Sequence, residues 1–184
     1  MSVTITFPDG SERQYESGVT GAEIAASIGP RLAKAAVAVR LDGAEVDLGR
    51  PITSDGRLEV ITAASESGRH VLRHSAAHVM AQAVLDLYPG ARFAIGPPIT
   101  DGFYYDFEVD EPFTPDDLER IEARMDEIIA EDQPFEREEL SVSEALEVFA
   151  DQPFKTEIIE SVDEEEGAGG SEVSVYRNLG FVDL

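Results

Sequence analysis

Apolar and polar residues alternate in short runs at the start of the chain. Every second residue is apolar from Val3 to Phe7, the run breaks at residues 8–10, and a further run of mixed polarity continues through Tyr15. A period of two is typical of a half-buried strand. The segment therefore predicts a β-hairpin.

A helix and three more strands are predicted in the next fifty residues. Thr20 and Glu23 have the spacing of a capping box before residues 24–28, and Gly29-Pro30 is a helix stop. Residues 36–41 and 44–48 flank Asp42-Gly43, a dipeptide that favours a tight hairpin turn, and residues 58–62 form a last strand. This order predicts a ubiquitin-like β-grasp domain over residues 1–62.

Residues 63–68 are small or polar and have no apolar period, so we expect a linker there. From Arg69 to Leu87 apolar residues mix with alanines, and residues 88–90 end the pattern, which predicts a long helix. All three histidines of the chain, His70, His74 and His78, lie on this helix.

The second half of the chain predicts an α+β domain over residues 69–184, in which helices pack on an antiparallel sheet. Residues 93–107 suggest strand, turn and aromatic strand, and residues 114–115 open an amphipathic helix. The apolar positions of that helix step by three and four: Leu118, Ile121, Met125, Ile128 and Ile129. A strand at 135–142, helices at 143–150 and 153–162, a mobile loop at 163–170 and strands at 173–176 and 180–184 complete the prediction.

Composition narrows the possible functions. The chain has 38 acidic and 14 basic residues, a formal charge of −24, and most of the acidic excess lies after residue 100. Such a charge opposes tight binding of a polyanion unless lysines and arginines gather on one face. The absence of cysteine excludes disulfides and zinc sites built on thiolates in these residues. No segment reads as a membrane span or a basic, apolar leader, so we expect a cytoplasmic protein that does not enter a membrane.

The histidines are the first candidates for chemistry. Residues four apart on a helix project from nearly the same face, so His74 and His78 can hold one metal ion or position one water molecule. A catalytic zinc ion usually has three protein ligands, and the chain has no cysteine and no fourth histidine to complete such a site. The pair is also compatible with ordinary surface or partly buried histidines.

Several motifs, in order, resemble the N-terminal region of bacterial threonyl-tRNA synthetases. Residues 7–11, 29–35 and 61–63 are similar to the TGS module of that family. The segments at 73–78, 94–97, 101–106 and 180–184 are similar to motifs of its editing domain. An H-x-x-x-H editing domain also occurs in alanyl-tRNA synthetases and their free-standing relatives, but the module in front favours the threonyl family.

The resemblance implies a proofreading hydrolase that removes serine attached in error to threonine tRNA. It matches four residues to catalytic positions, His74, His78, Lys155 and Asp183, and three to substrate-binding positions, Gly96, Tyr105 and Tyr176. Either histidine would orient or activate water, Lys155 would stabilise negative charge, and Asp183 would bind the substrate ammonium or ribose. His70 has no counterpart. If the resemblance is set aside, Lys155 is interpreted as a solvent-exposed helix residue and Asp183 as a hydrogen-bond acceptor in a turn. The two tyrosines are then ordinary aromatic residues of a sheet with exposed hydroxyls.

The resemblance also sets expectations for cofactors and partners. It implies no cofactor in this region, with ATP and zinc used in the catalytic domain of the full-length enzymes. The implied partners are the acceptor end of tRNA, bound weakly, and the amino acid serine; the full-length enzymes are homodimers, and this chain is expected to be a monomer. In the family a Cys-x-Gly-Pro-His segment follows Val-Asp-Leu, where this sequence stops, so the editing domain is expected to be incomplete. The alternatives are a non-catalytic module that binds RNA or protein, and a metal-dependent deacylase of the alanyl type.

Overall fold

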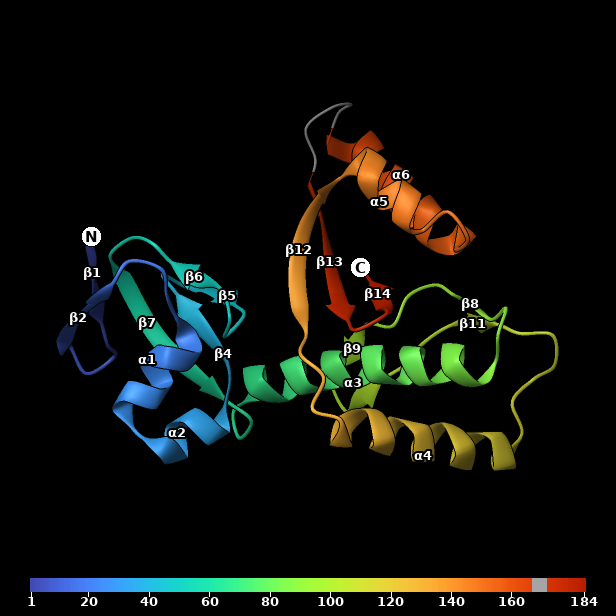
Figure 1. The fold of residues 1–184 in the computed structure, drawn as a ribbon, viewed down its shortest axis with the longest axis horizontal. Coiled ribbons are helices and arrows are strands. Elements are labelled where there is room, and N and C mark those ends of the chain that lie inside the picture. The colour runs from blue at the N-terminus through green and yellow to red at the C-terminus, as the bar shows by residue number, and fades with distance from the viewer. Residues whose placement is uncertain (167–171) are drawn as a thin grey trace. The chain divides into compact units, whose positions relative to one another are not determined.

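The computed structural model describes residues 1–166 and 172–184. They form two compact units, Met1–Arg73 and His74–Leu184. Figure 1 labels the elements of both units.

The first unit is built on a five-stranded mixed sheet in the order β2-β1-β7-β4-β5. Strands β1 and β7 are parallel, and the other neighbours are antiparallel. The strands are β1 (Ser2–Thr6), β2 (Glu12–Glu16), β4 (Ala36–Leu41), β5 (Ala44–Val46) and β7 (Gly56–Thr62), with a small pair β3 (Val19–Thr20) and β6 (Pro51–Ile52). The helices are α1 (Gly21–Ile28) and α2 (Pro30–Ala35). This is the predicted β-grasp arrangement.

Local sequence explains most of this unit. Thr20 and Glu23 form the predicted capping box at the start of α1. Helix α1 ends at Gly29 as predicted. The short helix α2 that follows was not predicted. Pro30 occupies its first position, where the missing backbone N–H would have no partner within the helix. Asp42 and Gly43 both have positive φ, as a tight hairpin turn requires. The core combines strand and helix residues: Val3, Ile5, Phe7, Ile24, Val39, Ile52 and Leu58.

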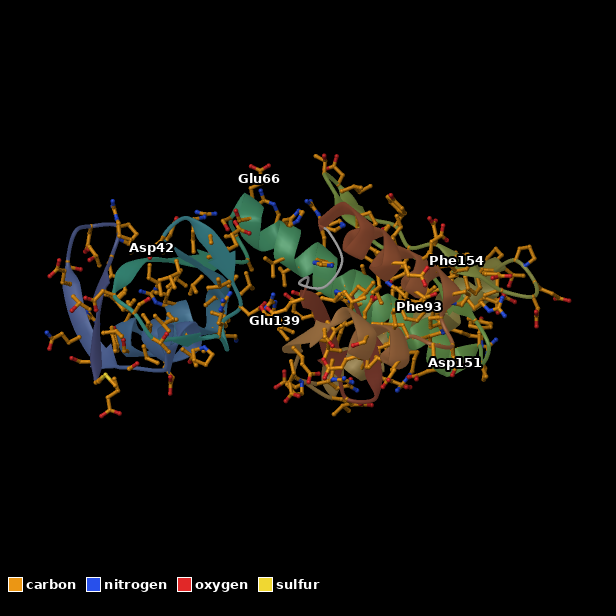
Figure 2. The ribbon with its side chains drawn as sticks, turned by 90° about the horizontal axis from the view of Figure 1, so that it is seen from above. Asp42, Glu66, Phe93, Glu139, Asp151 and Phe154 are labelled. Carbon is orange, nitrogen blue, oxygen red and sulfur yellow. The ribbon has the colours of Figure 1, made fainter. Side chains whose placement is uncertain are left out.

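The long helix α3 (Glu66–Leu87) begins three residues earlier than predicted, inside the segment expected to be a linker. Glu66 stands at its exposed start (Figure 2). The Ser65 hydroxyl accepts a hydrogen bond from the backbone N–H of Gly68 at 3.0 Å, so it caps the helix. The segment was predicted to be a linker because its residues are small or polar and show no apolar period, although one of them, Ser65, caps the helix.

Gly68→Ala is expected to destabilise the first unit. A Cβ atom on Gly68 would lie 1.9 Å from the carbonyl oxygen of Thr62, a backbone atom that cannot move aside without displacing the end of β7. We expect a loss of about 1–3 kcal/mol in the free energy of unfolding, as for other overpacked sites. Gly49→Ala is the matched control, because its Cβ would meet nothing within 4 Å. Equal denaturation midpoints for the two variants would contradict the expected clash.

The second unit combines the rest of α3 with short strands, three further helices and a three-stranded sheet. Antiparallel sheet β12-β13-β14 consists of β12 (Glu136–Ser141), β13 (Glu172–Asn178) and β14 (Phe181–Asp183). The helices are α4 (Pro115–Ala130), α5 (Val142–Val148) and α6 (Pro153–Glu166). The aromatic strands are four short pieces, β8 (Arg92–Phe93), β9 (Pro98–Ile99), β10 (Gly102–Phe103) and β11 (Phe107–Glu108), in two antiparallel pairs.

Two hydrophobic clusters hold the second unit together. One joins α3 to α4, which run side by side in Figure 1, through Val79, Val84, Ile121 and Ile128 among others. The other joins α3, α5 and α6 to β8, β13 and β14: Ala81, Phe93, Ala145, Phe149, Ile159, Val173, Val175 and Phe181. Among the described residues, no helix is both long and apolar enough to cross a bilayer.

The structure adds detail to one prediction for this unit and corrects another. Leu118 and Ile129, which fit the apolar stripe of α4, are exposed by 59% and 61%. The stripe is narrower than the pattern suggests, because only its centre meets α3. Residues 163–166 belong to α6 and not to a loop, since the helix continues through the acidic run. The remainder of the predicted loop, residues 167–170, lies outside the described residues.

Candidate active site

One face of α3 carries a row of polar side chains four residues apart. The ring centroids of His74 and His78 are 4.6 Å apart, so the two imidazoles share one environment. His78 is 5% exposed and Gln82, one turn further on, is 7% exposed, whereas His74 is half-buried. His70 is exposed. The helix thus brings its polar row from solvent into the core.

Asp183 is the centre of the buried polar network. Its Oδ2 atom accepts hydrogen bonds from His78 Nδ1 at 2.7 Å and from the Tyr105 hydroxyl at 2.6 Å. Its Oδ1 atom lies 2.5 Å from Lys155 Nζ and accepts the backbone N–H of Leu184 at 2.8 Å. Lys155 also donates to the Tyr105 hydroxyl at 3.1 Å. Both carboxylate oxygens are therefore fully used by protein groups.

Burial and charge act against each other in this network. Lys155 is 3% exposed and Asp183 is 1% exposed. Burial lowers the pKa of Lys155, although the carboxylate beside it acts in the opposite direction. Burial acts to raise the pKa of Asp183, but the hydrogen bond from His78 and the charge of Lys155 outweigh it and hold that pKa below its ordinary value. Burial and the charge of Asp183 raise the pKa of Tyr105, which stays a neutral donor.

The ionised carboxylate fixes the tautomer of His78. A carboxylate only accepts hydrogen bonds, so the proton between it and Nδ1 sits on the imidazole. In the neutral ring Nε2 then carries the free lone pair. Nε2 is buried and has no hydrogen-bond partner among the described residues. Such a nitrogen, with an open lone pair and an aspartate bonded to the other side of the ring, can accept a proton.

Aromatic rings surround the two histidines. Tyr176 lies 6.5 Å from His74 and 5.8 Å from His78 between ring centroids, and Phe135 lies 6.2 Å from His78. Tyr176 pairs directly with Asp183 across β13 and β14, which brings the tyrosine and the carboxylate together. Another aromatic ring, that of Phe93, contacts the network at Lys155, whose ammonium lies 4.9 Å from the ring centre.

Gly96 lies directly against Tyr105. A Cβ atom at this position would stand 2.1 Å from Tyr105 Cδ2, which no side-chain contact tolerates. The close approach lets the Tyr105 ring stand where its hydroxyl reaches both Asp183 and Lys155. Only glycine allows this spacing.

Gly96→Ala is therefore expected to push Tyr105 away from Asp183. We expect destabilisation of the second unit by about 1–3 kcal/mol and the loss of the Tyr105–Asp183 hydrogen bond. Gly180→Ala is the control, because its Cβ would meet nothing within 4 Å. Urea unfolding measures the first effect, and ultraviolet titration of the tyrosines measures the second as a fall of the Tyr105 pKa toward that of a free phenol. A Tyr105 titration unchanged in Gly96→Ala would contradict this role of the glycine.

The lowered pKa of Asp183 predicts acid sensitivity. The unfolded chain takes up a proton at the ordinary aspartate pKa of about 3.9, whereas the folded chain resists it until lower pH. The stabilisation is therefore fully present above the unfolded pKa and is lost as the pH falls through the lower folded pKa. Unfolding free energies measured from about pH 6 to about pH 2 should fall less steeply for Asp183→Asn than for the parent. Parallel curves would mean that Asp183 does not titrate in this way.

The structure brings the sequence-predicted residues together. Hydrogen bonds and an ion pair join Lys155, Asp183, His78 and Tyr105. The rings of His74 and Tyr176 lie near each other and near the ring of His78. Gly96 packs against Tyr105. Sequence reasoning missed Phe93, Phe135 and the buried pair Gln82 and Asn178; for Gln82 the signal was present, because it continues the four-residue spacing of the histidines. Across residues 1–166 and 172–184, no three histidine, aspartate or glutamate side chains are grouped as ligands for a metal ion.

Comparisons with known proteins give a family for part of the first unit and relatives for the whole chain. Residues 3–62 match the family described as the TGS domain. The chain is similar along its length to threonine–tRNA ligases: 50% identical over 184 residues to that of Thiobacillus denitrificans and 51% over 185 residues to that of Pelobacter propionicus. The alignments cover 99% and 100% of this chain and 28% of each relative. The chain thus matches the N-terminal part of these ligases and spans less than a third of their length.

Proposed function

We propose that this chain, which matches the N-terminal part of threonine–tRNA ligases, carries in its second unit a hydrolase that cleaves serine from threonine tRNA. One observation supports this most: His78, Asp183, Lys155 and Tyr105 form a buried, hydrogen-bonded network beside a second histidine. A buried ion pair contributes little to stability compared with apolar residues of the same volume. A site that perturbs several pKa values in this way is more often functional.

His78 is the general base in this proposal. Its Nε2 atom takes a proton from a water molecule, whose oxygen attacks the ester carbonyl carbon. The bond from that carbon to the ribose oxygen then breaks, and His78 returns the proton to the leaving oxygen. Because His74 is the more exposed of the two rings, we place the ester on the His74 side, between His74 and Tyr176.

Asp183 and Lys155 act through His78 in this proposal. The carboxylate has no lone pair left for a substrate ammonium or ribose, so its task is to hold the His78 tautomer and to stabilise the imidazolium that forms. Lys155 keeps the carboxylate ionised inside the core, and Tyr105 bridges the two. This assignment differs from the direct substrate contact expected for Asp183 from the resemblance.

The selection of serine has a physical reason. A synthetic site that accepts threonine excludes serine poorly, because one missing methyl group is worth only about 1–3 kcal/mol. A second site that hydrolyses the wrong ester removes the error after synthesis.

The experiment is hydrolysis of threonine tRNA charged with labelled serine or with labelled threonine. We expect the chain to release serine faster than threonine and His78→Ala to release neither. His70→Ala is the matched control, because His70 is an exposed histidine on the same helix. Loss of hydrolysis in both variants, or none in the parent, would overturn the proposal. A parallel reaction with a metal chelator distinguishes the metal-dependent deacylase.

The properties of a whole enzyme belong to the same proposal. We propose that the complete protein is a threonine–tRNA ligase of the cytoplasm, a homodimer that uses ATP and zinc in a catalytic domain beyond these residues. The net charge of −24 opposes strong binding of tRNA by this chain alone. A dissociation constant in the nanomolar range at physiological salt would contradict that part.

A further inference from the structure

Three side-chain amides, two of them buried, form a second network beside the histidines. Gln82 Oε1 accepts a hydrogen bond from Asn178 Nδ2 at 2.7 Å, and Gln82 Nε2 donates to Gln133 Oε1 at 3.1 Å. Gln82 is 7% exposed and Asn178 is 1% exposed. Gln133 in turn donates to Glu131 near the surface. The network thus runs from the core of the second unit outward.

Each amide stands next to an element of the proposed active site. Gln82 follows His78 by one helical turn on α3, about 6 Å along its axis. Asn178 follows Tyr176 by two residues on β13, which is about 6.7 Å and the same face of the strand. Because the two spacings are similar, residues on α3 and β13 contact each other in pairs. The ring of His78 lies near that of Tyr176, and Gln82 is hydrogen-bonded to Asn178.

The third amide extends the network to the segment before β12. Gln133 lies two residues before Phe135, whose ring lies near His78. Gln82 therefore connects the helix that carries the histidines with the strand that carries Tyr176 and with the segment that carries Phe135. These are three of the elements that contribute side chains around His78.

Stability alone does not explain the network. The Oδ1 atom of Asn178 is buried without a hydrogen-bond partner among the described residues. A buried acceptor without a partner carries the whole cost of its lost hydration, so a pair of apolar side chains would suit the core as well or better. Buried polar pairs are retained in some proteins because they fix one arrangement of packed elements.

We infer that Gln82 and Asn178 are positioning residues for the proposed hydrolysis. Their hydrogen bond sets the register between α3 and the β13–β14 hairpin, and with it the contact between His78 and Asp183. Phe181, directly opposite Asn178 in the hairpin, is two residues before Asp183, so a shift at Asn178 is passed to the carboxylate. The inference rests on the proposed function for its effect on rate, but its effect on His78 can be measured without any substrate.

The test is the double variant Gln82→Met/Asn178→Leu, which replaces both amides by apolar groups of similar size. We expect an unfolding midpoint equal to or above that of the parent and a fall of about ten- to a hundredfold in deacylation, the loss that a small misplacement of a catalytic group causes. Gln14→Met, an exposed exchange in the first unit, is the matched control.

The second readout is the ¹⁵N spectrum of the imidazoles. The chain has three histidines, so their signals can be assigned with one variant each. In the parent, His78 should show a protonated Nδ1 and a bare Nε2; in the double variant it should show a mixture of tautomers, while exposed His70 stays unchanged. If the parent has no deacylase activity, the proposed function fails, and the spectrum still tests the positioning.

Unchanged His78 signals in a folded double variant would overturn the inference, whatever the rate. Should the double variant not fold, Asn178→Ala supplies the same test, because it removes the hydrogen bond and the unpartnered oxygen together. A loss of rate with an unaltered His78 spectrum would also overturn it, since the amides would then act by another route.

Discussion

Asp183→Asn is expected to reduce deacylation by roughly 10³- to 10⁴-fold, because an amide beside Nδ1 stabilises the wrong tautomer of the base. It should also destabilise the second unit by about 3–5 kcal/mol, because the buried Lys155 ammonium loses its countercharge. Single-turnover deacylation and urea unfolding measure the two effects. The wrong tautomer should appear directly in the ¹⁵N spectrum as a protonated Nε2 on His78.

A control separates the tautomer from general disruption. Asp117→Asn removes a carboxylate that caps α4 and binds Tyr88, at a position outside the network. That variant should lose stability but retain the parent rate while folded. If Asp183→Asn keeps a rate within about threefold of the parent, far from the loss expected for a wrong tautomer, His78 is not the base that this geometry indicates.

Lys155→Met should have the second-largest effect. It leaves the Asp183 carboxylate buried without its cation, which costs about 3–5 kcal/mol in the free energy of unfolding. The charge of Lys155 is one of the causes that hold the pKa of Asp183 below its ordinary value, so the variant should raise that pKa. We expect hydrolysis to fall, because a protonated carboxyl can donate to Nδ1 and so favour the wrong tautomer of His78.

A double-mutant cycle distinguishes stability from function at this pair. Lys155→Met/Asp183→Leu should regain most of the lost stability, because an apolar pair replaces both charges, and yet remain inactive. Additive losses of stability in the two single variants and the double variant would show that the ion pair is not coupled. Recovery of activity in the double variant would exclude the pair from the reaction.

The fold was predictable where a short-range device fixes the structure. The capping box of Thr20 and Glu23 and the turn at Asp42 each depend on neighbours in sequence, and both appear as predicted. The start of α3 was missed because its cap, Ser65, is a single hydroxyl among small residues. The exposure of Leu118 does not follow from the sequence, because a periodic stripe gives the face of a helix but not how far its neighbour extends.

The site was predictable only in part from its residues. The spacing of His74 and His78 places both rings on one face, and that geometry holds. Lys155 and Asp183 lie far apart in sequence, on a helix and a strand, so nothing local in their sequence indicates a contact; the family resemblance supplied them. The amide pair Gln82 and Asn178 was missed although Gln82 continues the spacing of the histidines, because nothing local in the sequence shows that the two amides meet.

The bond between His78 and Asp183 joins residues separated by 105 positions, which has a consequence for synthesis on the ribosome. When α6 emerges, the Lys155 ammonium has no anion to meet, and its burial is unfavourable until β14 has been translated. We therefore expect the nascent second unit to stay open and protease-sensitive until the β13–β14 hairpin forms. Translation of β14 would thus supply the carboxylate that balances the buried charge of Lys155.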